Sequence, residues 1–102
     1  MDLLSRIKRL VASGHVSFSV KAGEELAREG YFPDSVKESI LNAPLINKKL
    51  RSHHPVTGER EYLYVIIGSS YDGLICYTKE TIRREQDEET YYIVISSKRS
   101  IG

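Results

Sequence analysis

Residues 47–60 hold the densest group of side chains that could act on a phosphate ester. Arg51 and Arg60 offer guanidinium groups, which bind phosphate through paired hydrogen bonds. His53 and His54 titrate near neutral pH and can move a proton. Metal-independent cleavage of RNA needs a cation for the scissile phosphate and a proton shuttle for the 2′-hydroxyl and the leaving 5′-oxygen. The alternative interpretation is a polar connection between strands, which is ordinarily rich in such residues.

Tyrosine and lysine side chains extend this hypothesis. Tyr64 could stack on a base or donate a proton, so it joins His53, His54 and Arg60 as a candidate catalytic residue. The alternative for the tyrosines is a half-buried ring with its hydroxyl at the edge of the core. Candidate phosphate ligands from the residues alone are Lys48, Arg51 and Lys79.

Strong catalytic or metal-binding motifs are absent from the sequence. It contains no phosphate loop, no G-x-S-x-G elbow, no Cys-x-x-Cys pair and no H-E-x-x-H. His53 and His54 are adjacent, and in an extended segment their rings point apart. We therefore expect neither a metal nor a cofactor. His15 is interpreted as a helix-end residue and Cys76 as a small buried hydrophobe.

Length and composition favour one small soluble domain. The chain has 102 residues, a formal net charge of +1 and a single cysteine. One cysteine excludes an intrachain disulfide and suits a reducing cytoplasm. The apolar runs are too short for a bilayer span, so no membrane partner is expected. The near-neutral net charge argues against a protein that coats nucleic acid nonspecifically.

The small net charge hides segregated blocks of charge. Residues 1–21 and 47–60 each sum to +3, whereas residues 22–39 and 80–89 each sum to −3. Such blocks can become separate surface patches even when the total cancels.

Hydrophobic periodicity predicts helices first and strands afterwards. Apolar residues recur at helical spacing in 2–13, 19–29 and 33–43, and Gly14 and Gly30 are typical stops. The period then changes to two, which predicts strands at about 45–51, 61–68, 74–79 and 90–97. The strand at 61–68 is apolar or aromatic on both faces, so it should be interior. Asp72-Gly73 predicts a hairpin turn, and residues 80–89 a charged loop or short helical turn.

This order predicts an α+β domain over residues 1–102. Its N-terminal helices would pack on one face of a C-terminal antiparallel sheet of three to four strands. Residues 15–19 are left as either a strand fragment or a loop.

The order of segments also resembles a known family. The residues that carry the resemblance are Ile7–Ser19 (IKRLVASGHVSFS), Lys21–Gly30, Val36–Ala43, Tyr64–Gly68 and Asp72-Gly73. They are similar to a domain-of-unknown-function family (number 4258) of small, mostly bacterial proteins, which is grouped with the RelE/barnase-like toxin nucleases. The opening is also similar to that of the motility quorum-sensing regulator (MqsR) toxins. The resemblance covers roughly residues 5–97.

The resemblance implies a RelE/barnase-like fold, a sheet cleft that binds single-stranded RNA, metal-free cleavage and a cognate antitoxin protein. The family often has a His-Ala pair where this chain has Lys21-Ala22, and a histidine in the strand where this chain has Cys76-Tyr77. Lys21 would then keep a cationic, phosphate-binding role. The acid and base would fall to His53, His54 or Tyr64.

Two hypotheses follow. The first is a cytoplasmic, metal-independent endoribonuclease (an mRNA interferase) of a toxin–antitoxin pair, with single-stranded RNA and an antitoxin as partners and a homodimer left open. The second is a non-catalytic module of the same fold that binds a partner protein. Convergence of Arg51, His53, Arg60, Tyr64 and Lys79 in one basic cleft would favour the first, whereas their dispersal over the surface would remove its basis.

Overall fold

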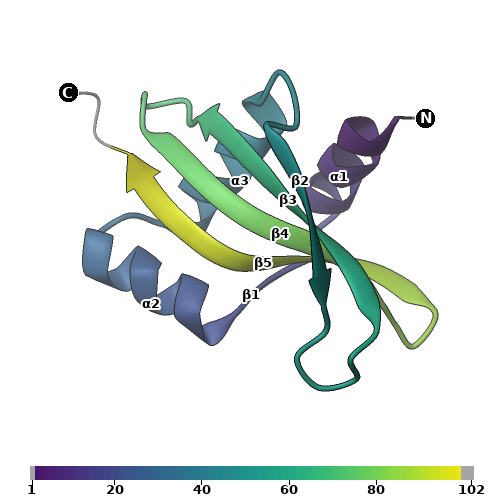
Figure 1. The fold of residues 1–102 in the computed structure, drawn as a ribbon. Helices are drawn as coiled ribbons and strands as arrows, with labels where there is room; N and C mark the ends of the chain where they lie inside the picture. The colour runs from purple at the N-terminus through teal and green to yellow at the C-terminus, as the bar shows by residue number, and fades with distance from the viewer. Residues whose placement is uncertain (1, 100–102) are drawn as a thin grey trace.

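The computed structural model describes residues 2–99, which form three helices and a five-stranded mixed sheet (Figure 1). The elements are α1 (Leu3–Ala12), β1 (Val16–Phe18), α2 (Val20–Glu29), α3 (Pro33–Asn42), β2 (Lys48–His53), β3 (Arg60–Ser69), β4 (Ile75–Glu85) and β5 (Glu88–Arg99). The general α+β class is confirmed.

The helices lie within one residue of their predicted bounds because their capping signals are local. Ser19 caps α2 by accepting a hydrogen bond from the backbone N–H of Ala22. Gly30 ends the same helix in the left-handed conformation, with a φ of 71°. Pro33 occupies the first turn of α3, where its missing N–H costs no hydrogen bond.

The sheet differs from the prediction in strand number and in one pairing. The strand order is β1-β5-β4-β3-β2, and β2 to β5 form the expected antiparallel meander with β3 in an interior position. The prediction of only three to four antiparallel strands was wrong, because β1 adds a fifth strand parallel to β5. This strand also separates α1 from α2, so the helices do not all precede the sheet.

The loop or helical turn predicted at residues 80–89 was also wrong. β4 and β5 continue through this segment as a long hairpin, joined at Gln86 and Asp87. These two residues have φ values of 50° and 65°, as a tight two-residue hairpin turn requires. The segment is charged because its strands extend beyond the core.

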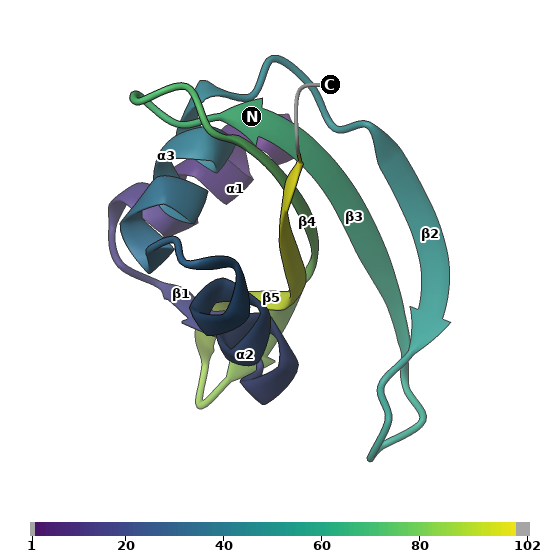
Figure 2. The same cartoon turned by 90° about the vertical axis from the view of Figure 1, so that its left-hand side faces the viewer.

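All three helices pack on one face of the sheet. Figure 2 shows the helices on one side of β3 and β2, which curve away on the other side. Buried side chains from both layers form the core: Ile7, Leu10, Val11, Ala22, Leu26, Tyr31, Val36, Ile40, Ala43, Tyr64, Ile66, Cys76, Tyr91 and Ile93. Cys76 is completely buried, as predicted. We call the opposite, helix-free side of the sheet the open face.

Gly68 marks the closest approach between α3 and the sheet. A Cβ atom at this position would lie 1.9 Å from the backbone oxygen of Ser39. We expect Gly68→Ala to lower the free energy of unfolding by about 3 kcal/mol or more, because α3 or β3 must shift. Urea unfolding would measure the loss.

Gly23 provides the matched control for this substitution. It lies in α2, and a Cβ atom added there would meet no other atom within 4 Å. Gly23→Ala should therefore raise the free energy of unfolding by about 0.5–1 kcal/mol, through helix propensity alone. Equal effects of the two substitutions would contradict the close contact at Gly68.

Candidate functional site

The sheet register divides the predicted site residues between two faces. Side chains directly opposite each other on paired strands share a face. Lys48, Val65, Lys79 and Ile95 form one such row across four strands. Val65 alternates with the core residues Tyr64 and Ile66, so this row lies on the open face. Two predicted phosphate ligands, Lys48 and Lys79, therefore flank Val65 on the side without helices.

Other predicted residues belong to the helix side. Tyr64 is only 9% exposed and packs in the core. Arg51 of the outer strand lies opposite Tyr62. Arg60, Tyr62 and Tyr64 are two residues apart on β3, so their side chains lie on the same face of the sheet. Thus the structure does not bring all the predicted residues into one cleft.

A hollow of about 300 Å³ opens on the open face beside the start of α2, and we call it the open-face hollow. It lies between α2, the ends of β2 and β3, and the outer parts of β4 and β5. Its lining residues are Ser19, Lys21, Ser52, His53, Pro55, Glu61, Leu63, Arg83, Tyr92 and Val94. Two predicted residues, Lys21 and His53, both line this hollow although they are far apart in the sequence.

An ion pair between Arg83 and Glu61 lines this hollow. The Arg83 Nη2 and Nε atoms lie 3.1 and 3.3 Å from the two carboxylate oxygens of Glu61. The guanidinium also lies over the ring of Tyr92, 4.5 Å from its centroid. The two charged side chains are 17% and 13% exposed. A bidentate contact and a ring contact together hold Arg83 in one position.

Sequence reasoning missed both members of this pair. Arg83 fell in the segment predicted as a loop, so no strand register could relate it to Glu61. Residues 80–85 (Glu-Thr-Ile-Arg-Arg-Glu) do not alternate apolar with polar residues, so the sequence carries no periodic signal for this strand.

Lys21 and His53 sit at the rim of the open-face hollow, and both are exposed. Lys21 lies in the first turn of α2. The start of that helix is attached to the sheet because the Ser19 hydroxyl donates to the backbone oxygen of Val94 at 2.7 Å. His53 is the last residue of β2 and the register partner of Arg60, so it lines the hollow at the end of the strand and not from the open face itself. Both residues are thus carried by regular elements.

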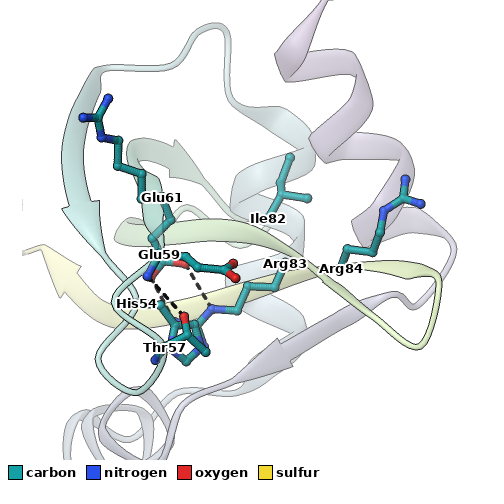
Figure 3. Close-up of a pocket in the computed structure, with 8 residues that line it drawn as sticks. His54, Thr57, Glu59, Glu61, Ile82, Arg83 and Arg84 are labelled. Carbon is teal, nitrogen blue, oxygen red and sulfur yellow. Dashed lines mark hydrogen bonds and ion pairs between the residues drawn. The ribbon is translucent and has the colours of Figure 1, made fainter.

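A second hollow adjoins the first at Glu61 and Arg83, and we call it the arginine hollow. It consists of two adjoining cavities of about 290 and 270 Å³ that share Arg60, Glu61, Ile82 and Arg84. Figure 3 shows the first of these, with Arg83 pointing to Glu61 and Arg84 pointing away from it. Three predicted residues line this hollow: His54, Arg60 and Tyr64.

His54 organises the loop that borders the arginine hollow. Its Nδ1 atom accepts hydrogen bonds from the backbone N–H groups of Val56 and Thr57, at 3.0 and 3.2 Å. Two donors pointing at Nδ1 require that nitrogen to be unprotonated. Its backbone N–H also donates to the oxygen of Glu59 at 2.8 Å. These contacts oppose a proton-shuttle role for His54 and leave that role to His53.

Tyr64 is a poor candidate for a base. Burial raises the pKa of its phenol, and the positive charge of Arg6 offsets only part of that rise. The hydroxyl therefore stays protonated at neutral pH.

Glu80 is completely buried on the helix side of β4, opposite Tyr64 and Ile93. Its carboxylate oxygens and the Tyr91 hydroxyl are among the buried polar atoms without a hydrogen bond in the described region. Burial raises the pKa of Glu80 to about 8, and the nearby hydroxyls of Tyr91 and Thr78 offset part of the rise. The carboxyl is therefore largely protonated at neutral pH. It is sealed from both hollows and belongs to stability rather than to a site.

Comparisons with known proteins add no relative. No family model, no curated protein and no solved structure matches this chain. Within residues 2–99, no helix is long and apolar enough to cross a membrane. The same part of the chain contains no group of three His, Cys, Asp or Glu side chains arranged to hold a metal.

Proposed function

We propose that the protein is a metal-independent endoribonuclease that cleaves single-stranded RNA in the open-face hollow. One observation carries the proposal: four of the residues that line this hollow, Glu61, His53, Lys21 and Arg83, have a carboxylate, an imidazole and two cationic side chains. These four groups supply a base, an acid and charge stabilisation for a phosphate. No single segment of the sequence contains them all.

The chemistry is a transfer of phosphorus from the 5′-oxygen to the 2′-oxygen. The Glu61 carboxylate takes the proton of the ribose 2′-hydroxyl as the 2′-oxygen forms a bond to phosphorus. Protonated His53 gives its proton to the 5′-oxygen as the bond between phosphorus and that oxygen breaks. The products are a 2′,3′-cyclic phosphate and a free 5′-hydroxyl. Lys21 and Arg83 stabilise the charge on the phosphate oxygens.

The rest of the open face suits an unpaired RNA strand. Lys48 and Lys79 place two ammonium groups along it, and Tyr92 presents a half-buried ring in the hollow. Single-stranded RNA is ordinarily held by cations that follow the backbone and rings that stack on bases.

The toxin–antitoxin setting rests on the resemblance to family 4258 and to the RelE/barnase-like nucleases. The chain departs from that family at two positions where the family often has histidine. Lys21 lines the open-face hollow, and Tyr77 lies opposite Ile67 on the open face. We propose a cytoplasmic protein of RelE/barnase-like fold that a cognate antitoxin neutralises.

Incubation of the purified protein with an unstructured RNA in the presence of EDTA tests the activity. We expect fragments that end in a 2′,3′-cyclic phosphate, and no cleavage where the ribose on the 5′ side of the scissile bond is replaced by 2′-deoxyribose. Expression in a bacterium should arrest growth. Intact RNA under all these conditions would overturn the proposal.

The alternative, a module that binds a partner protein, is favoured by one apolar groove of about 500 Å³. Its lining comes from β1, α2 and the start of α3: Phe18, Gly23, Leu26, Ala27, Gly30, Tyr31, Phe32 and Pro33. Phe32 is 73% exposed there. If this function holds, Phe32→Asp would abolish the growth arrest that expression causes, whereas Glu61→Gln would retain it.

A further inference from the structure

Two arginines line the arginine hollow, Arg60 from β3 and Arg84 from β4. The β3–β4 pairing runs from Ser69↔Ile75 to Tyr64↔Glu80. Continued along the strands, this register places Glu61 opposite Arg83, in agreement with their ion pair, and Arg60 opposite Arg84. Both arginines line both cavities of the hollow, and both are exposed.

This arrangement is unfavourable for the protein alone. Like charges directly opposite each other on neighbouring strands repel. Glu89 is the cross-strand neighbour of Arg84 on β5, but its carboxylate is ion-paired with Arg6 of α1. Among the described side chains, neither Arg60 nor Arg84 has an ion-pair partner. Two guanidinium groups that line one hollow without an ion-pair partner are therefore suited to bind the phosphates of an anionic ligand.

We propose that the arginine hollow is a second phosphate subsite, which binds the RNA strand next to the nucleotide being cleaved. The inference rests on the proposed function, since it takes the occupant of the open-face hollow to be RNA. Glu61 and Arg83 line both hollows, so the two sites adjoin across this ion pair. A strand that leaves the open-face hollow past the ion pair would enter the hollow that Arg60 and Arg84 line.

An aromatic ring favours a nucleotide over a peptide carboxylate as the occupant. Tyr62 lines the arginine hollow and is 41% exposed, although it is a large apolar ring. The Lys49 ammonium lies 4.2 Å from the centroid of this ring. A ring beside paired guanidinium groups can stack on a base while the arginines hold its phosphate.

Binding of an RNA strand that cannot be cleaved tests the subsite separately from catalysis. The probe is a fluorescent 2′-O-methyl oligouridylate of nine nucleotides, followed by anisotropy over a series of salt concentrations. The double substitution Arg60→Ala and Arg84→Ala should weaken binding at least tenfold. The slope of log affinity against log salt should become shallower by about 0.7, as expected for one lost single-strand phosphate contact. Arg28→Ala, an exposed arginine of α2, is the control for loss of charge.

The outcomes separate the two proposals. Weaker binding by the double variant, with no cleavage by the wild-type protein, would keep the subsite and remove the nuclease. Cleavage by the wild type with unchanged affinity and salt slope in the double variant would remove the subsite alone. A poly-glutamate peptide that binds through both arginines, when the oligonucleotide does not, would assign the hollow to an acidic protein. No binding of the oligonucleotide by the wild type would overturn the subsite.

Discussion

The Glu61→Gln variant is expected to cleave single-stranded RNA at least about 100-fold more slowly than the wild type, because loss of a positioned general base costs that much or more. Glutamine keeps one oxygen that can accept a hydrogen bond from Arg83, and it loses the second acceptor and the charge. The amide cannot take the proton from the 2′-hydroxyl. The rate should be measured with substrate well below its KM, over a range of pH.

A carboxylate outside both hollows gives the control for this substitution. Glu88 is exposed and lines neither the open-face hollow nor the arginine hollow, so Glu88→Gln should retain cleavage close to the wild-type rate. The pH dependence adds a second readout, since loss of a base should remove the rise in rate on the acid side of the profile. Equal rates for Glu61→Gln and the wild type would exclude Glu61 as the base.

The second large effect is expected in stability rather than activity, and it comes from Glu80. Burial raises the folded-state pKa of this carboxyl to about 8, compared with an ordinary value of 4.5. A raised carboxyl pKa means that folding favours the protonated form. The contribution of the protonated Glu80 carboxyl to the free energy of unfolding is therefore present in full below about pH 4.5 and is lost as the pH rises toward 8. With about 1.4 kcal/mol for each pH unit, the loss in the free energy of unfolding is at most about 5 kcal/mol.

The neighbours of Glu80 do not change this sign. Tyr91 and Tyr64 face it from β5 and β3, and burial raises the pKa of each phenol above its usual value of 10. Both therefore stay neutral over the window from pH 4.5 to 8. The titration of Glu80 is the main buried contribution in that range.

Urea unfolding at several pH values would measure this dependence. Glu80→Gln and Glu80→Met should both flatten the decline between pH 5 and 8 and should exceed the wild type in stability above pH 8. Glu24→Gln, on the exposed side of α2, should leave the slope unchanged. A wild-type stability that stays constant between pH 5 and 8 would show that Glu80 is not a buried neutral carboxyl.

Much of the fold could be predicted because its signals lie within a few residues of each other. Ser19 and Gly30 bound α2 through contacts with residues at most four positions away. Residues 62–67 are apolar or aromatic on both faces of the strand, which is enough to identify an interior strand. Asp72-Gly73 lies in the turn between β3 and β4, where Gly73 has a φ of 87°.

The site was only partly predictable, because its members are joined by pairing between distant segments. The sequence by itself determined which side chains have the chemistry: the histidines, the lysines and the arginines of residues 47–60. Tertiary structure alone decided that His53 and Lys21 meet, that His54 is used by its own loop and that Tyr64 is buried. It also decided that Glu61 pairs with Arg83, because only the register of β3 against β4 determines which residues face each other. A one-residue shift in that register would move each of these side chains to the other face of the sheet.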